Sequence, residues 1–263
     1  MIIYKSESEI QAIRKTNQVV ARILSELAGM VRPGIATLEL DRYAERRTRE
    51  LDAIPAFKGY RGYPASLCTS LNEEIVHGIP SNRKLKEGDI LSIDFGAILD
   101  GFYGDAAVTF PVGKITPAAE KLIAAAEESF FKGIEQAIPG KRIGDISAAV
   151  QAHVESRGFS VIRNFVGHGI GFSLHEEPQV PNFGLSGHGP KIKPGMVLAI
   201  EPMIAAGDWD VEILADNWTA ITRDRSLSAH HEHTIAVTQD GPQILSSLDT
   251  RGGRNALKEP LHA

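Results

Sequence analysis

Residues 90–110, ILSIDFGAILDGFYGDAAVTF, carry the strongest structural signal in the chain. The Asp-Gly dipeptide at 100–101 is a typical two-residue hairpin turn, and the residues on both sides of it favour strands. With this turn, Asp94 lies opposite Ala107 on the second strand. Asp105 stands two residues from Ala107 on that strand and shares its face. The pattern therefore predicts a hairpin with two aspartates on one face, their side chains within reach of each other.

Two carboxylates this close together repel each other and raise the pKa of one of them, unless a cation lies between them. Neither strand offers a lysine or arginine on that face, so a divalent metal ion is the simplest way to neutralise the pair. Two other interpretations stay open. Exposed aspartates are common on solvent-facing antiparallel strands, and a register shifted by one residue would place Asp94 and Asp105 on opposite faces.

Around this hairpin, one order of elements occurs twice: a helix, a Pro-Gly pair, a second helix and strand-like segments. The pairs Pro33-Gly34 and Pro139-Gly140 stand 106 positions apart. Helices are predicted over 6–30, over 37–51, from Thr116 through Ile134, and over a segment ending at Gly158. Strands are predicted over 89–99, 102–112, 159–166, 196–204, 209–213, 217–223 and 230–238. Helices that segregate from antiparallel hairpins indicate an α+β fold, here with two related halves.

The composition is that of a globular protein and argues against two classes of partner. Of the 263 residues, 43% are hydrophobic and 23% are charged, and the formal net charge is −5. This balance gives no basic surface for nucleic acid or an anionic membrane. Cys68 is the single cysteine, which excludes an intrachain disulfide and is typical of a reducing compartment. We expect a cytoplasmic protein, because the first residues lack a secretory signal and no apolar run reaches about 18 residues. We also expect one domain over 1–250 and a loose tail over 251–263.

Three further side chains with metal-binding chemistry lie in unusually apolar or glycine-rich segments. His168 lies in VGHGIG, where flanking glycines allow the backbone to approach a ligand closely. Glu201 lies in GMVLAIEPMIA, where burial without a partner would be costly, although Pro202 is also compatible with an edge strand and a solvent-facing Glu201. Glu232 lies in SAHHEHTIAV. Strand alternation puts it on one face with His230, whereas His231 and His233 take the other, and either face could bind metal.

Taken together, Asp94, Asp105, His168, Glu201 and Glu232 form an oxygen-rich set with a single nitrogen. Carboxylates that are shared between ions can bridge two cations about 3.5–4 Å apart, as in two-metal hydrolases. Such hard, oxygen-rich ligation favours Mn, Fe(II), Co or Zn, in contrast to the soft ligation of a thiolate site. The sequence does not choose among these metals.

Six ordered motifs carry a resemblance to a known family. They are NEEIVHGIP with His77, IDFGAILDGFYGDAA with Asp94 and Asp105, GHGIG with His168, FSLHEEPQV with His175, AIEPM with Glu201, and HHEHT with Glu232. Over residues 3–247 the chain resembles the type I methionine aminopeptidases, the short bacterial form, of metallopeptidase family M24. The resemblance implies the pita-bread fold, in which two pseudo-symmetric halves share a curved antiparallel sheet with flanking helices.

The resemblance also implies roles for individual residues. Asp105 and Glu232 would bridge two divalent ions, Asp94 would hold one ion, and His168 with Glu201 would hold the other. Glu201 would also move the proton of the attacking water. His175 would donate to the scissile carbonyl, and His77 would contact the substrate near the peptide nitrogen after the scissile bond.

A pocket for the methionine side chain is implied around Tyr60, Tyr63, Cys68 and Trp218. Aromatic walls and a soft sulfur suit a polarizable thioether. Relatives typically carry phenylalanine where this chain has Leu174, and some carry cysteine where it has Phe57. These two departures predict a reshaped pocket.

The implied substrate is the N-terminal peptide of a nascent chain with a small second residue, reached near the ribosomal exit tunnel by a monomeric enzyme. One alternative is a relative of different specificity, such as an Xaa-Pro aminopeptidase, although these usually carry an extra N-terminal domain. Another is a binding protein that keeps the fold without metals. No role is predicted for His153, His188, His230, His231, His233 and His262, apart from the idea that His231 or His233 supports the metal ligands from behind.

Overall fold

The computed structural model describes residues 1–248 of the chain, so the predicted tail over 251–263 lies outside the described residues. The helices are α1 (Glu7–Ala28), α2 (Thr37–Glu50), α3 (Pro117–Ile134) and α4 (Ile143–Ser156), with a 3-10 turn η1 (Tyr60–Gly62). The strands are β1 (Ile54–Pro55), β2 (Leu67–Leu71), β3 (Glu74–Val76), β4 (Ile90–Leu99), β5 (Phe102–Pro111), β6 (Ser160–Val161), β7 (Gly167–Gly169), β8 (Glu176–Val180), β9 (Val197–Ile200), β10 (Met203–Ala205), β11 (Val211–Ile213), β12 (Ala220–Thr222), β13 (Ser228–His230), β14 (Glu232–Thr238) and β15 (Gly241–Ile244).

The predicted hairpin forms in the predicted register. β4 and β5 pair over their whole length, with Asp94 opposite Ala107 and Asp105 opposite Gly96. Asp100 and the glycine after it both take positive φ, as the turn requires. The alternative register shifted by one residue is thereby excluded.

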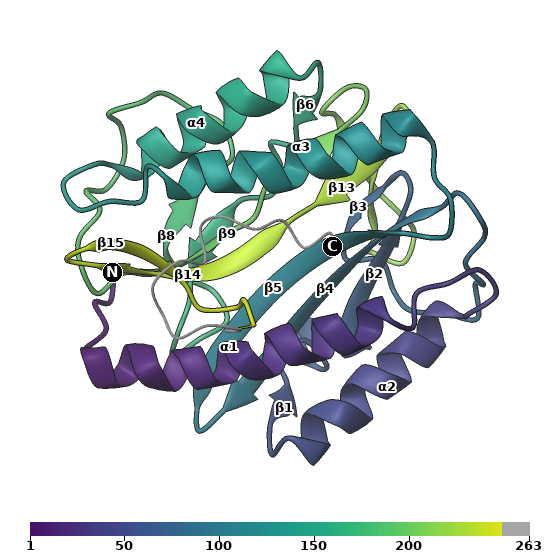
Figure 1. Ribbon diagram of the computed structural model, residues 1–263, viewed down its shortest axis with the longest axis horizontal. Helices are drawn as coiled ribbons and strands as arrows, with labels where there is room; N and C mark the ends of the chain where they lie inside the picture. The colour runs from purple at the N-terminus through teal and green to yellow at the C-terminus, as the bar shows by residue number, and fades with distance from the viewer. Residues whose placement is uncertain (249–263) are drawn as a thin grey trace.

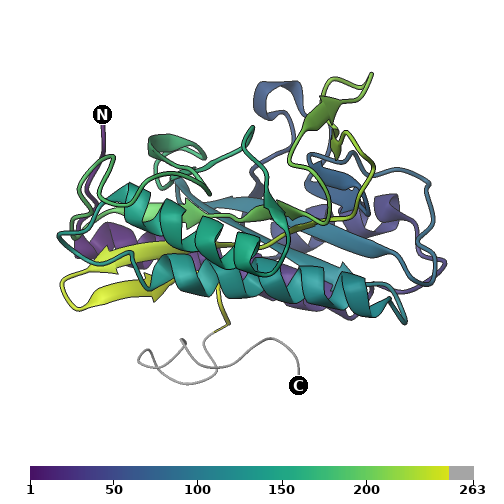
Figure 2. The same cartoon turned by 90° about the horizontal axis from the view of Figure 1, so that it is seen from above.

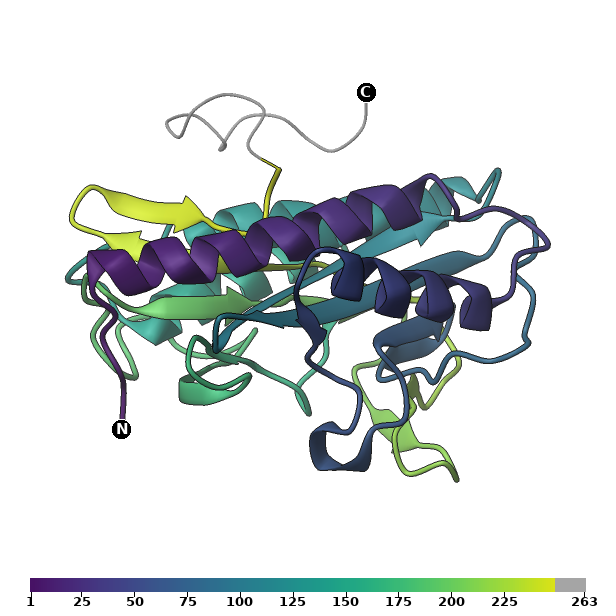
Figure 3. The ribbon, with the colours of Figure 1, turned by 90° about the horizontal axis from the view of Figure 1, so that it is seen from below.

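A nine-stranded antiparallel sheet forms the centre of the fold, in the order β1-β4-β5-β14-β9-β7-β8, with β2 also pairing with β4 and β15 with β14. The helices lie along this sheet as two pairs, α1 with α2 and α3 with α4 (Figure 1). Seen edge-on, turn η1 and the β11–β12 hairpin project together from the opposite face (Figures 2 and 3). The helices therefore cover one face of the sheet, and η1 and the β11–β12 hairpin lie on the other.

Two related halves are visible in the local geometry, as predicted. α2 and α4 each have 14 residues and begin 106 positions apart. Gly34 and Gly140, just before them, both take φ near +90°. Ala36 bridges to Lys84, and Arg142, its counterpart, bridges to Lys191. The same helix–turn–helix–strand unit therefore occurs twice, and each copy contributes strands to the central sheet.

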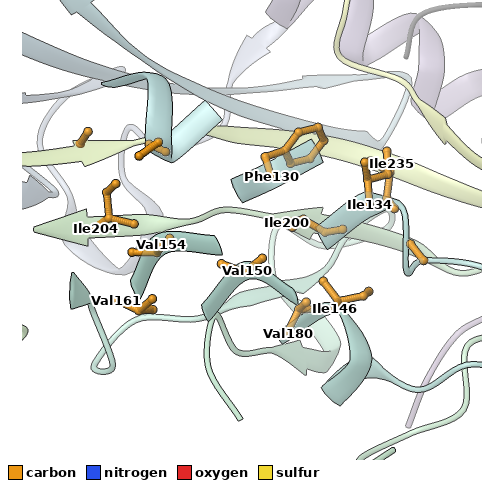
Figure 4. Packing of buried hydrophobic residues seen from close by; sticks show 14 of the residues in the cluster. Phe130, Ile134, Ile146, Val150, Val154, Val161, Val180, Ile200, Ile204 and Ile235 are labelled. Carbon is orange, nitrogen blue, oxygen red and sulfur yellow. The ribbon is translucent and has the colours of Figure 1, made fainter. Parts of the chain in front are cut away.

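Each helix pair buries its apolar stripe against the sheet. Ser6 caps α1 with the predicted box to Glu9, and Thr116 caps α3 ahead of Pro117. Under α3 and α4, Phe130, Ile134, Ile146, Val150 and Val154 pack against Ile200, Ile204 and Ile235 of the strands (Figure 4). In the described part of the chain, none of the helices is both long enough and apolar enough to span a membrane.

Several predicted strands are wrong in extent, and those over 209–213 and 217–223 shorten to β11 and β12. The 159–166 strand shortens to β6, the 196–204 strand divides into β9 and β10, and the 230–238 strand gives way to β13 and β14. Pro202 cannot donate to a ladder, and the His231 backbone N–H donates to the carbonyl oxygen of Pro202. The two breaks face each other where the chain leaves the nine-stranded sheet for the small β13-β10-β6 sheet. Glu201 and Glu232 both stand at these breaks.

Candidate metal centre

The strand register brings three of the predicted ligands to one face of the sheet. Asp94 on β4 lies opposite Ala107 on β5, and Glu232 on β14 lies opposite the same alanine from the other side. Asp105 stands two residues from Ala107 on β5. Residues that pair across strands, or stand two apart on one strand, point to the same face. The three carboxylates therefore gather around an alanine, whose small side chain leaves the space between them open.

The other two predicted ligands reach the same face from β7 and β9. His168 lies opposite Ala199, and Ala199 in turn lies opposite Thr234, two residues from Glu232. Glu201 follows Ala199 by two positions. β9 runs between β14 and β7, and the side chain of Glu201, one residue beyond it, is 13% exposed, so the alternative of an edge strand with Glu201 in solvent is excluded. A second alanine leaves room in this half of the cluster.

The distances show that the side chains of Asp105, His168, Glu201 and Glu232 lie close together. Glu201 Oε1 is 3.4 Å from His168 Nε2. His168 Nδ1 lies 3.0 Å from the carbonyl oxygen of Gly169, so Nε2 is the nitrogen that faces the carboxylates. Donor atoms of Asp105, His168 and Glu232 all lie within 4.8 Å of one another. Donor atoms of a second group, Glu201, His230 and Glu232, also lie within 4.8 Å of one another.

Burial shapes the protonation of this cluster. Asp105 is 4% exposed and Glu232 is 2% exposed. Burial raises the pKa of all four carboxyl groups, those of Asp94, Asp105, Glu201 and Glu232, and the charge of Asp94 raises that of Asp105 further. Burial also lowers the pKa of His168 to about 3, which keeps its imidazole neutral. Four crowded acids beside a neutral imidazole form a site that lacks positive charge.

The donor set fits divalent cations. Within residues 1–248, no lysine or arginine lies within ion-pairing distance of these four carboxylates. Among the same residues, Asp94 Oδ1, Asp105 Oδ1 and Glu232 Oε1 are buried oxygens that lack a hydrogen-bond partner. Buried polar atoms normally have partners. A hard cation would satisfy these oxygens and neutralise the repulsion between the acids.

Cation binding is expected to release protons and to weaken as the pH falls. The raised pKa values leave part of the cluster protonated near neutral pH, and a cation must displace those protons. Lowering the pH from 8 to 6 should weaken Co(II) affinity roughly tenfold per pH unit for each proton displaced. His168 is already neutral and adds nothing to this release. Titration calorimetry in two buffers of different ionisation enthalpy measures the proton count, and a pH-independent affinity with no buffer effect would contradict the assignment.

A cavity of about 210 Å³ opens beside the carboxylates. Cys68 on β2 pairs with Asp94, which places its sulfur on the same face of the sheet. Tyr63 donates its hydroxyl to the carbonyl oxygens of Leu67 and Gly78, and its ring meets Trp218 edge-on at 5.1 Å. The four pocket residues predicted from the sequence, Tyr60, Tyr63, Cys68 and Trp218, all line this cavity. Phe57 and Leu174, where this chain departs from its relatives, line it as well.

Two further predicted histidines line the same cavity. His175 Nδ1 lies 2.8 Å from the hydroxyl of Tyr60, and its ring centroid is 4.3 Å from that of His168. His77 takes a positive φ of 62° and packs edge-on against Phe165. Burial lowers the pKa of both His77 and His175 to about 4, so each is neutral at physiological pH.

A buried ion pair fixes the loop that carries His175. Lys5, just before α1, pairs with Glu176, and their side chains are 1% and 5% exposed. The other oxygen of Glu176 accepts the backbone N–H groups of Phe172 and Ser173. Neither Lys5 nor Glu176 was predicted to have a role, because an isolated lysine near the start of a chain carries no pattern.

Sequence reasoning also missed residues inside the cavity region. Val76, Phe165 and Met203 line the cavity, but apolar residues in short strands and loops give no local signal. His230 was assigned no role, yet its Nε2 lies 3.7 Å from Glu201 and 4.0 Å from Glu232. Strand alternation had placed it on this face. His231 and His233 lie on the other face, where both rings approach Phe130.

Comparison with known proteins relates this arrangement to other chains. The model of metallopeptidase family M24 matches residues 11–239. A methionine aminopeptidase from Clostridium acetobutylicum is 52% identical over 247 residues, which make up 94% of this chain and 99% of that protein. The crystal structure of methionine aminopeptidase from Rickettsia prowazekii matches with a TM-score of 0.93 at 40% identity, covering 94% and 100% of the two chains. The prolidase of Pyrococcus horikoshii, 23% identical with a TM-score of 0.77 over 94% of this chain and 64% of its own, shares the fold.

Proposed function

The chain belongs to metallopeptidase family M24, and from this membership we propose that it is a methionine aminopeptidase. It hydrolyses the N-terminal methionine from nascent proteins and peptides whose second residue is small. The observation that carries this proposal is the convergence of five ligand-type side chains on one sheet face, directly beside a cavity with aromatic walls and a sulfur. Relatives that are 52% identical over 94% of this chain bear the same activity in their names.

We propose that the centre holds two divalent ions. Asp105 and Glu232 would be shared between them, Asp94 would hold one, and His168 with Glu201 would hold the other. The unpartnered buried oxygens and the raised pKa values of Asp105 and Glu232 support cation binding by this cluster. Co, Mn, Fe(II) and Zn all suit a set of carboxylates and imidazole. The chemistry supplied by the ions, when bound, is Lewis-acid activation of a water and of the scissile carbonyl.

The protein's own groups would complete the reaction. Glu201 stands beside His168, where its carboxylate can take the proton of the attacking water and return it to the leaving amine. His175 is neutral and faces the cavity, where an imidazole N–H can donate to the carbonyl oxygen as negative charge develops there. His77, also in the cavity wall, would contact the substrate near the peptide nitrogen after the scissile bond.

The cavity would select methionine. Tyr60, Tyr63 and Trp218 provide aromatic surface, and Cys68 adds a polarizable sulfur. Leu174 and Phe57 both line it, so the reshaping predicted from these two departures falls on the binding surface itself.

We infer that the protein acts as a monomer in the cytoplasm, on chains that emerge near the ribosomal exit tunnel. All five proposed ligands and the pocket residues come from one chain, which supports a site complete within one molecule. Residues 1–250 would form its one catalytic domain, because both halves contribute strands to one sheet.

The decisive experiment compares Met-Ala-Ser with Ala-Pro peptides, with and without a chelator. We expect release of methionine from the first peptide and loss of this activity after chelation, restored by added divalent metal. Cleavage of the Ala-Pro peptide in preference would favour an Xaa-Pro aminopeptidase, which the prolidase fold also allows. Binding without cleavage, unaffected by chelator, would favour a metal-free binding protein.

A further inference from the structure

His230 lies inside the proposed centre without an assigned task. The residue is 1% exposed, and among the described residues its Nε2 is a buried atom without a hydrogen-bond partner. The nearest carboxylate oxygens are Glu201 Oε2 at 3.7 Å and Glu232 Oε2 at 4.0 Å. A buried imidazole nitrogen normally finds a partner, and Glu201 is the nearer candidate.

The backbone holds this imidazole in place. His230 donates its N–H to Thr109 Oγ1 at 2.9 Å, and that hydroxyl donates back to the carbonyl oxygen of His230 at 2.9 Å. Ser92 Oγ lies 2.8 Å from the same Thr109 oxygen. His230 also pairs with Met203 across β13 and β10. The ring therefore extends toward the carboxylates from a fixed base.

The carboxylate of Glu201 lies between two imidazoles. Its Oε1 is 3.4 Å from His168 Nε2, and its Oε2 is 3.7 Å from His230 Nε2. The carbonyl oxygen of Glu201 accepts a bond from Asn182 Nδ2, so its main chain is fixed as well. Only the side-chain torsions of Glu201 remain free, and the two imidazoles limit them from both sides.

We propose that His230 is a positioning residue for Glu201: its Nε2–H donates to Oε2 and thereby keeps Oε1 turned toward His168. A small rotation of either side chain closes the remaining gap. Carboxylates that bind metal are usually fixed by hydrogen bonds on their other oxygen, and removing such a partner typically lowers metal affinity or activity by about 10–100-fold. This inference rests on the proposed metal centre, because it assigns His230 to one of its ligands.

The chain provides a matched control in the next residue. His231 is also buried, and its Nε2 likewise lacks a partner among the described residues. Its ring faces Phe130 on the opposite side of the sheet, at a centroid distance of 5.6 Å. Replacing His231 by leucine therefore tests the general effect of removing a buried imidazole from this segment, without a change in contact with Glu201.

The experiment measures Co(II) affinity of the purified metal-free protein by calorimetry. His230→Leu, which fills similar space without a donor, should bind Co(II) about 10–100-fold more weakly than the unsubstituted protein. His230→Gln keeps a donor and should remain within a few-fold, and so should His231→Leu. Circular dichroism of each variant checks that it is folded. Equal losses in the Gln and Leu variants, or no loss in the Leu variant, would overturn the proposal.

A double-mutant cycle separates an action through Glu201 from a general effect. Added to Glu201→Gln, the His230→Leu change should have little further effect on Co(II) affinity, whereas additive losses would overturn the inference. In the Co(II)-loaded protein, NMR should show one strongly shifted imidazole N–H signal, that of His168. A second strongly shifted N–H signal, from His230, would show that His230 is a metal ligand and would overturn the proposal. Failure of Glu201→Gln to weaken binding would overturn the proposed centre itself, and with it this inference.

Discussion

Replacing Asp105 by asparagine is expected to lower kcat/KM by at least about 10³-fold, which corresponds to roughly 4 kcal/mol of transition-state stabilisation. Asp105 pairs with Gly96 on the hairpin and presents a buried oxygen that lacks a partner within residues 1–248. Asparagine has nearly the same shape but no charge, and it would leave the proposed shared ligand position without a carboxylate. Steady-state kinetics with a Met-Ala-Ser peptide and added metal measure the loss. Activity within tenfold of the unsubstituted enzyme would remove Asp105 from the ligand set.

The same substitution should make the metal-free protein more stable. Burial and the neighbouring Asp94 raise the pKa of Asp105, so ionising it disfavours the folded state, and a neutral side chain removes that penalty. Thermal unfolding in the presence of a chelator should therefore show a higher Tm near pH 8. A lower Tm would show that Asp105 stabilises the fold rather than a bound cation.

Asp145→Asn is the matched control, for which we expect lower stability and an unchanged kcat. Asp145 accepts bonds from Arg142, Ser186 and Gly187 near the start of α4, and these bonds lower its pKa to about 2. Its ionised form therefore stabilises the fold above the pH at which the unfolded group titrates, and this contribution is lost as the pH falls through about 2. The variant should lose stability at neutral pH but keep its kcat, because Asp145 lies outside the cavity.

Replacing His175 by alanine is expected to lower kcat by about 10²–10³-fold with little change in KM, the effect of losing one hydrogen-bond donor to a developing oxyanion. The Tyr60 hydroxyl lies against His175 Nδ1, which leaves Nε2 available to the substrate. His175→Gln retains an N–H group and should recover part of the loss. A higher KM at unchanged kcat would instead assign His175 to substrate binding alone.

The hairpin shows how far a local pattern can be trusted. A two-residue turn fixes the register of both strands, and the register fixes which side chains share a face, so Asp94 and Asp105 could be placed together from the sequence. His168 could not be placed in this way, because its face depends on the pairing of β7 with β9, two segments far apart along the chain. The glycine-rich segment marks His168 as a candidate ligand, but its place beside the other ligands is predicted only by the family resemblance.

The strand breaks show where local patterns fail. The segment around Glu201 is apolar enough to predict one continuous strand, but Pro202 lacks an N–H and the strand divides there. The facing break at His231 could not be predicted, because the partner of its N–H is the carbonyl oxygen of Pro202. Strand alternation could place His230 on the face of Glu232, but its short distance to Glu201 depends on long-range pairing and was not accessible from residue spacing.

The buried pair of Lys5 and Glu176 has a consequence for how the enzyme matures. Its partners are separated by 171 positions, so it joins the start of the chain to a loop in the second half of the fold. Contacts of such high sequence separation are slow to form, because the entropy of loop closure is lost before the contact stabilises anything. We therefore expect the loop with His175 to become ordered late, after both Lys5 and Glu176 have been synthesised and have met.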